Sequence, residues 1–249
     1  MIAALPMYDR IELRDATDAF WALIRHSLLD QQINAPASLT RDVDPWSIWT
    51  DPRLIFAQTC GLPYRARLHG KVTLVGTPDY GLPGCPAGYY NSVLVVNARA
   101  SERPIAEVLR GRLAINEGLS QSGWAALYAF AADLGIALTP ALKTGAHVLS
   151  ARAVAQGQAD LAAIDALSWH YIQRFDPMIA ENLREVARTN PTPALPYITA
   201  KSIDRAAILQ ALNLAITKLA PRYRDDLQIN AAIEIPAETY LEIPNPPKV

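Results

Sequence analysis

The stretch Tyr89-Tyr90-Asn91-Ser92-Val93-Leu94-Val95-Val96-Asn97 decides the fold, because one pattern of elements precedes it and the same pattern follows it. Its β-branched and aromatic residues predict a long buried strand. On either side, short apolar runs alternate with amphipathic segments, as in Ile2 to Pro6 followed by 15–29. Strands that alternate with helices favour parallel pairing and the α/β class.

A second stretch, residues 189–197, is rich in proline. Prolines favour extended backbone and predict that a preceding helix ends around Arg188. If 89–97 carries the chain out of a first lobe and 191–199 carries it back, the lobes are discontinuous: 1–92 with 193–249, and 93–192. The two crossings then form a hinge, and we expect a ligand cleft beneath it, where the carboxyl ends of the strands meet.

The chain beyond the second crossing predicts one more helix and a tail. Apolar residues recur on one side of Ser202–Lys218, and Ser202 is the expected N-cap. The segment after Asp226 is rich in proline and is expected to lie on the surface.

Composition points to a small-molecule partner. The 249 residues carry a formal net charge of −1 and only 19% charged residues, which argues against nucleic acid or anionic lipid. No apolar run approaches the roughly 18 residues of a membrane span. The opening residues lack the pattern of a secretory signal, and the residues alone leave the compartment open, with the cytoplasm as one alternative. We expect a monomer that is not embedded in a membrane.

The segment Ser120-Gln121-Ser122-Gly123 stands directly before the apolar run 124–130, within a helix predicted for 122–134. Two hydroxyls, the unpaired N–H groups of a first turn and the helix dipole together suit an oxyanion. The alternative is that one serine simply caps its own helix.

Two further residues of the second lobe are candidates for ligand contacts. His147 opens another predicted helix, where its side chain can donate to a phosphate-like oxygen, although a lone histidine is often only packed. Asp165 ends the apolar run Leu161–Ile164, where side chains emerge at the mouth of an α/β cleft. Capping of the following helix explains Asp165 equally well.

The first lobe offers an opposing wall. Tyr8 follows the first predicted strand, and Thr59 and Tyr80 also fall at strand ends. Aromatic side chains there can stack on a ligand or hydrogen-bond to it, or merely pack half-buried.

Cys60 and Cys85, the two cysteines, both lie in loops flanked by glycine or proline. A disulfide and two unpaired thiols both remain open. Two thiols and four scattered histidines make a poor metal site, and the nucleotide-binding glycine motifs are missing. We expect neither a metal nor a cofactor.

Taken together, these residues resemble the type 2 periplasmic substrate-binding proteins of phosphate, phosphite and phosphonate ABC transporters. The resemblance spans nearly the whole chain and is carried by Met7-Tyr8-Asp9, Gln58-Thr59-Cys60-Gly61, Asn116 through Gly123, Gly145-Ala146-His147, Gly157 through Asp165, and Leu195 through Thr199. It implies two α/β lobes joined by a two-strand hinge, a periplasmic location and a transporter permease as partner.

The resemblance also implies roles for individual residues. Ser120 through Gly123 would grip the phosphonate group with help from His147, and Asp165 matches a position that holds a ligand amino group. The first-lobe aromatic corresponds to Tyr8 or Tyr80. The family's usual Gly-Ser-His reads Gly-Ala-His here, at 145–147.

Two other functions use the same fold. An enzyme of the lyase or thiamine-pyrimidine-synthesis kind would employ Asp165 or His147 as a base and Cys60 as a nucleophile. A cytoplasmic ligand sensor would differ only in the signalling protein that recognises its closed form.

Overall fold

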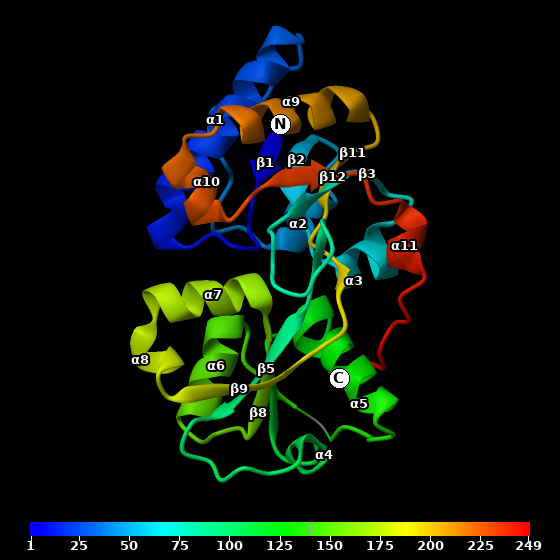
Figure 1. Ribbon diagram of the computed structural model, residues 1–249. Helices are drawn as coiled ribbons and strands as arrows, with labels where there is room; N and C mark the ends of the chain where they lie inside the picture. Colours follow the sequence, from blue (N-terminus) through cyan, green and yellow to red (C-terminus); the bar gives the residue numbers. More distant parts are fainter. Residues whose placement is uncertain (140) are drawn as a thin grey trace. The chain divides into compact units, whose positions relative to one another are not determined.

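The computed structural model describes residues 1–139 and 141–249, and its chain divides into two compact units. Unit 1 comprises Met1–Tyr89 and Pro193–Ile243, and unit 2 comprises Tyr90–Thr192 and Pro244–Val249. Each unit combines a mixed β-sheet with surrounding helices, which confirms the predicted α/β class (Figure 1). The chain passes between the units within β4 (Tyr89–Tyr90) and β10 (Thr192–Pro193), which pair as a two-stranded sheet.

Unit 1 contains a sheet with the strand order β1-β2-β11-β3-β12. Strands β1 and β2 pair in parallel, and the other pairings are antiparallel. The strands are β1 (Ile2–Ala4), β2 (Leu54–Gln58), β3 (Val72–Asp79), β11 (Tyr197–Ala200) and β12 (Ala231–Ile233). The helices are η1 (Ile11–Leu13), α1 (Arg14–Asp30), α2 (Pro45–Trp49), α3 (Gly61–Pro63), η2 (Tyr64–Leu68), α9 (Arg205–Lys218), α10 (Pro221–Leu227) and α11 (Ala237–Leu241).

Both faces of this sheet are buried, because apolar residues of β2 contribute to two separate cores. Phe56 packs with α1 and α9 on one face, whereas Leu54 and Ala57 pack with α2, η2 and Tyr240 on the other. Figure 1 shows α1, α9 and α10 as neighbours within this unit. Burying apolar area on both faces stabilises the strand ends from which the candidate residues of unit 1 emerge.

Unit 2 contains a second sheet, with the strand order β7-β6-β8-β5-β9. Strand β6 pairs in parallel with β7 and β8, while β5 runs antiparallel to both of its neighbours. The strands are β5 (Ser92–Asn97), β6 (Leu113–Ile115), β7 (Leu142–Lys143), β8 (Leu161–Asp165) and β9 (Leu183–Arg188). The helices are α4 (Ile105–Val108), η3 (Gln121–Ala125), α5 (Ala126–Asp133), α6 (His147–Ala155), α7 (Ala166–Phe175) and α8 (Pro177–Ala180).

The core of unit 2 holds its strand ends at one edge of the sheet. Leu94, Ile115 and Ala163 pack together with Trp124 and Leu127. Register pairing in β5 and β8 sets Ser92 opposite Asp165. The end of β6, the end of β8 and the start of η3 are therefore positioned by one shared core.

Two predictions around the crossings are wrong. The long strand of 89–97 is divided at Asn91 into β4 and β5, and the expected helix before Arg188 is the strand β9. Strand β9 pairs only with β5, at the edge of its sheet. An edge strand that buries Leu183 and leaves its other residues partly exposed has no continuous apolar run to distinguish it from a helix.

The predictions for the C-terminal part also need correction. Asp204, not Ser202, is the N-cap of α9, because its carboxylate accepts a 2.9 Å hydrogen bond from the amide of Ala206. The segment after Asp226 contains β12 and α11 and contributes Ile229, Ile235 and Tyr240 to the cores of unit 1. Prolines at 236 and 244 interrupt its pattern without preventing burial.

Residues 244–249 group with unit 2 rather than with lobe 1, where the sequence had placed them. The indole nitrogen of Trp124 donates a 2.9 Å hydrogen bond to the carbonyl oxygen of Pro247. Val249 packs against the core of unit 2, and its carbonyl accepts a hydrogen bond from Lys143. The N–H of a buried indole needs a hydrogen-bond acceptor, and residues 244–249 supply one for Trp124.

Exchange of Asp204 for alanine tests the assigned N-cap. Asp204→Ala should lower the free energy of unfolding by about 1 kcal/mol, because the Ala206 amide loses its acceptor. Ser202→Ala, two residues earlier and also exposed, is the matched control and should leave stability unchanged. Urea denaturation followed by circular dichroism measures both. A larger loss in the Ser202 variant would contradict the assignment.

Candidate functional site

The first turn of the helix after β6 is unusually wide. In η3 the amide of Ala125 bonds to the carbonyl of Ser120 at 3.0 Å, five residues back, and the amide of Ala126 likewise reaches Gln121. Such π-type turns widen the backbone and are frequent at functional sites. The turn brings Ser120, Gln121 and Ser122, all at most 3% exposed, to the start of a helix that continues through α5.

Ser120 acts as the N-cap of this helix. Its backbone is extended, and its hydroxyl accepts a 2.9 Å hydrogen bond from the amide of Gly123. The hydroxyls of Ser120 and Ser122 are 3.4 Å apart. Ser120 therefore fills the structural role that was the alternative to ligand binding, while Ser122 is left for another contact.

Ser122 bonds to His147, which lies 25 residues further along the chain. Its hydroxyl is 2.9 Å from Nε2 of the imidazole at the start of α6. The backbone N–H of Ser122 makes no hydrogen bond within the described part of the chain. An orphan amide in a first turn carries part of the positive end of the helix dipole.

The imidazole of His147 is uncharged at neutral pH. Desolvation lowers its pKa to about 4, although the carbonyl of Ala163 acts in the opposite direction. Its Nδ1 is buried and has no hydrogen-bond partner of good geometry among the described residues. A neutral imidazole has one donor and one acceptor nitrogen, so the tautomer decides whether Nε2 donates to the hydroxyl of Ser122 or accepts from it.

Asn116 and Gly123 meet closely at this turn. A side-chain carbon added to Gly123 would lie 1.9 Å from Oδ1 of Asn116 and 3.2 Å from the hydroxyl of Ser120. That oxygen of Asn116 is buried and has no hydrogen-bond partner among the described residues. Gly123 is thus required by close packing, and Asn116 is a polar residue of the site to which the sequence assigned no role.

Asp165 ends β8 and begins α7. One of its carboxylate oxygens accepts a 2.9 Å hydrogen bond from the amide of Ser168, so Asp165 is the N-cap of α7, and it is only 2% exposed. Its register partner Ser92 donates a 2.9 Å hydrogen bond to the carbonyl of Ser122. Ser92 thereby connects the β8 edge to the first turn of η3.

The sequence did not single out Ser92. A serine at the start of an apolar strand carries no motif, and only the pairing of β5 with β8 brings it to the site.

In unit 1, two of the candidate aromatic residues are in contact. The rings of Tyr8 and Tyr80 meet edge to face, with 5.7 Å between their centroids and 85° between their planes. The amide nitrogen of Gln58 donates to the hydroxyl of Tyr80 at 2.8 Å and to the carbonyl of Leu195 at 3.1 Å. Tyr80 is buried and held from two sides, whereas Tyr8 is half-buried.

Thr59 and Cys60 follow β2, and Cys60 precedes the short helix α3. Thr59 is fully buried, and its hydroxyl has no hydrogen-bond partner among residues 1–139 and 141–249. The disulfide between Cys60 and Cys85 is not formed in the structure. The thiol of Cys85 points to the carbonyl of Pro83 in its own loop, at 3.8 Å.

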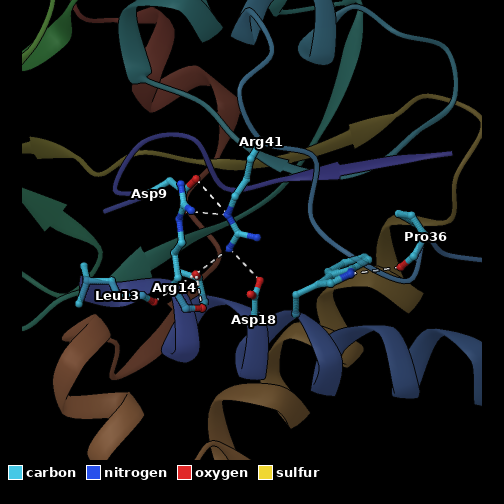
Figure 2. A network of polar contacts seen from close by, with 8 residues as sticks. Asp9, Leu13, Arg14, Asp18, Pro36 and Arg41 are labelled. Atoms are coloured by element: carbon cyan, nitrogen blue, oxygen red, sulfur yellow. Dashed lines mark hydrogen bonds and ion pairs between the residues drawn. The ribbon is translucent and has the colours of Figure 1, made fainter. Parts of the chain in front are cut away.

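Asp9, beside Tyr8, forms an ion pair with Arg41. Figure 2 shows Arg41 between Asp9 and Asp18, with its Nε 3.1 Å from each carboxylate oxygen of Asp9 and its Nη2 2.7 Å from Asp18. Burial lowers the pKa of Arg41, but the hydrogen bonds to Asp18 and Asp9 outweigh it and leave the pKa above its ordinary value.

Metal ligands do not gather in the described residues, where no three histidine, cysteine, aspartate or glutamate side chains are placed to share an ion. Across those same residues, the helices are too short or too polar for a membrane span.

Comparison with known proteins identifies the family. Residues 56–240 match the model of the periplasmic substrate-binding proteins of phosphonate ABC transporters. This match covers most of the chain, and the chain belongs to this family. It is a solute-binding protein that works with a transporter, not an enzyme. No curated protein matches the sequence.

Solved structures show the same fold at low sequence identity. XAC2383 from Xanthomonas citri, bound to ATP, has a TM-score of 0.72 at 13% identity, with 96% of this chain and 92% of that chain covered. PhnD1 from Prochlorococcus marinus in complex with methylphosphonate has a TM-score of 0.71 at 17% identity, with 96% and 94% covered.

A binding protein component of an ABC phosphonate transporter from Pseudomonas aeruginosa is similar as well. It has a TM-score of 0.66 at 16% identity, with 93% of this chain and 80% of that chain covered. These structures confirm the type 2 periplasmic-binding-protein fold.

Substitution of Gly123 tests the close approach to Asn116. Gly123→Ala should lower the free energy of unfolding by about 1–3 kcal/mol, because the new methyl group overlaps Oδ1 of Asn116. Gly118→Ala is the matched control, since its nearest neighbour would be at an ordinary 3.8 Å. Adding Asn116→Ala to Gly123→Ala should restore part of the loss in chemical denaturation. Equal stability of both glycine variants would refute the packing constraint.

Acid should destabilise the protein through His147. Its pKa is lower in the folded state than the ordinary 6.5, so the unfolded chain binds a proton first as the pH falls. This contribution is complete above pH 6.5 and is lost between pH 6.5 and 4, by about 2–3 kcal/mol. Denaturation at pH 7 and pH 4.5 should show a smaller acid loss in His147→Gln than in the parent.

The exposed His26 on α1 provides the comparison for this experiment. His26→Gln should keep the full acid loss of the parent. If the His147 and His26 variants lose the same stability between the two pH values, the desolvation of His147 is not responsible.

Proposed function

We propose that the protein binds a small phosphonate or a related oxyanion, such as phosphate or phosphite, at the start of η3, and delivers it to the permease of an ABC transporter. The observation that carries this proposal is the buried group formed by Ser122, its unbonded amide and His147. Donors of this kind at a helix start complement a tetrahedral oxyanion without a cationic side chain. Membership of the phosphonate-binding family and the methylphosphonate complex of PhnD1 support the ligand class.

The residues of this site have distinct proposed roles. Ser122 donates through its hydroxyl and amide, His147 accepts or donates as the hydroxyl turns, and Gln121 and Gly123 contribute backbone at the wide turn. Ser120 mainly maintains the turn, because its oxygen already accepts from Gly123.

A ligand with an amino group would find a carboxylate in Asp165. One of its oxygens is bonded to the amide of Ser168, and an ionised carboxylate has several acceptor positions in addition. From unit 1, we propose Tyr8, Tyr80 and Thr59 as further ligand contacts. Tyr8 is the more accessible of the two rings.

The remaining proposals concern assembly. We propose a monomer whose two lobes correspond to units 1 and 2, with neither nucleic acid nor lipid as a ligand. The formal net charge of −1 supports recognition of a small molecule by local hydrogen bonds rather than by a large charged surface.

Calorimetry with phosphate, phosphite, methylphosphonate and 2-aminoethylphosphonate tests the function. At least one should bind, and combining Ser120→Ala with Ser122→Ala should weaken it by about 1–3 kcal/mol for each charge-assisted hydrogen bond lost. Ser101→Ala, an exposed serine of the same unit, should bind like the parent. Unchanged affinity in the double variant would mean that neither serine contacts the ligand, and no binding by the folded parent would remove the proposed ligand class.

A further inference from the structure

The loop that carries Tyr8 has little regular structure of its own. After β1 ends at Ala4, the chain turns through residues 5–10 before η1 begins at Ile11. Within it, the amide of Arg10 bonds back to the carbonyl of Tyr8 at 2.9 Å. A short turn of this kind leaves the direction of the Tyr8 side chain to be set by contacts from elsewhere.

Arg41 supplies such a contact from a distant part of the sequence. It lies in the segment of unit 1 between α1 and α2. The indole of Trp21 donates to the carbonyl of Pro36 in this segment, and the amide of Thr40 donates to the carbonyl of Ala3. Its Nε is 3.1 Å from both carboxylate oxygens of Asp9, the residue that follows Tyr8.

The same guanidinium is fixed at its other side to α1. Nη2 donates to Asp18 at 2.7 Å and to the hydroxyl of Thr17 at 3.1 Å. The side chains of Arg41 and Asp9 are 17% and 19% exposed, so this ion pair is largely shielded from solvent. The planar guanidinium of Arg41, bonded to the carboxylates of Asp9 and Asp18, has a defined orientation, unlike an ion pair that is fully exposed to solvent.

We propose that Arg41 is a positioning residue for ligand binding: by fixing Asp9 against α1, it holds the adjacent Tyr8 edge-on to Tyr80, where Tyr8 meets the ligand. The proposal rests on the proposed function, which makes Tyr8 a ligand contact. Arg41 acts through Tyr8 and not on the ligand, because its Nε and Nη2 are already directed at protein acceptors. Tyr80 gives the ring a firm surface, since Gln58 holds the hydroxyl of Tyr80 at 2.8 Å.

A double-mutant cycle measures this indirect effect. With methylphosphonate and inorganic phosphate as calorimetric probes, Arg41→Met should raise the Kd of whichever probe binds roughly tenfold. In a Tyr8→Ala background, the same substitution should change the Kd less than about twofold, because the ring it positions is gone. An equal loss in both backgrounds, or none in either, would overturn the proposal.

Arg53→Met is the matched control. Arg53 also pairs with an aspartate of unit 1, Asp51, but its side chain is 67% exposed. The Arg53→Met variant should bind each probe with the same Kd as the parent. If Arg41→Met fails to fold, Arg41→Lys replaces it. A lysine ammonium cannot reproduce the forked contact with Asp9 and Asp18, so Arg41→Lys should raise the Kd above that of the parent, by less than about tenfold.

Tyrosine-selective NMR separates the positioning from the binding. Arg41→Met should shift the ring resonances of Tyr8 and Tyr80, assigned through Tyr8→Phe and Tyr80→Phe, whereas Arg53→Met should not. Unshifted resonances would contradict the role of Arg41 even when the parent binds ligand. If instead the parent binds neither probe while the resonances shift, the proposed ligand has failed and the affinity effect with it, but the positioning of Tyr8 stands.

Discussion

The close approach between Asn116 and Gly123 is the constraint on which unit 2 depends. Only a residue without a side chain lets the first turn of η3 lie against the end of β6, and this allows Ser120 to cap the helix and directs Ser122 to His147. The carbonyl of Ser122 is then held by Ser92 from β5. One backbone position thus connects two strands and two helices, and a side chain there would disturb all of them.

Much of the architecture could be predicted because the strongest signals are local. The helix of 15–29 and the apolar runs at Ile2 to Pro6 and Leu161–Ile164 show patterns that tertiary packing does not contradict. The sequence did not predict β9 or the N-cap at Asp204, because neither depends on a periodic pattern of apolar residues. An edge strand such as β9 is defined by its pairing with a neighbouring strand, and an N-cap by the amide to which its side chain bonds. Both are contacts in space that the order of residues does not show.

The candidate site was predictable only in part for a related reason. Ser122 and His147 stand at helix starts, where sequence signals are strong, and the structure brings them within a hydrogen bond. Ser92, Asn116 and Arg41 have no such signal, because each acts through a residue far away in the sequence. The ion pair of Asp9 with Arg41 also has no sequence signal, since Arg41 lies in a segment without regular structure.

Trp124 follows Gly123 directly, and its buried indole is fixed by the carbonyl of Pro247 and tilted against Tyr128. An indole held in one environment has a narrow emission band, and a change in the adjoining turn alters that environment. The protein therefore carries a built-in optical probe beside the first turn of η3, and removal of its other tryptophans would make changes at that turn readable without any attached dye.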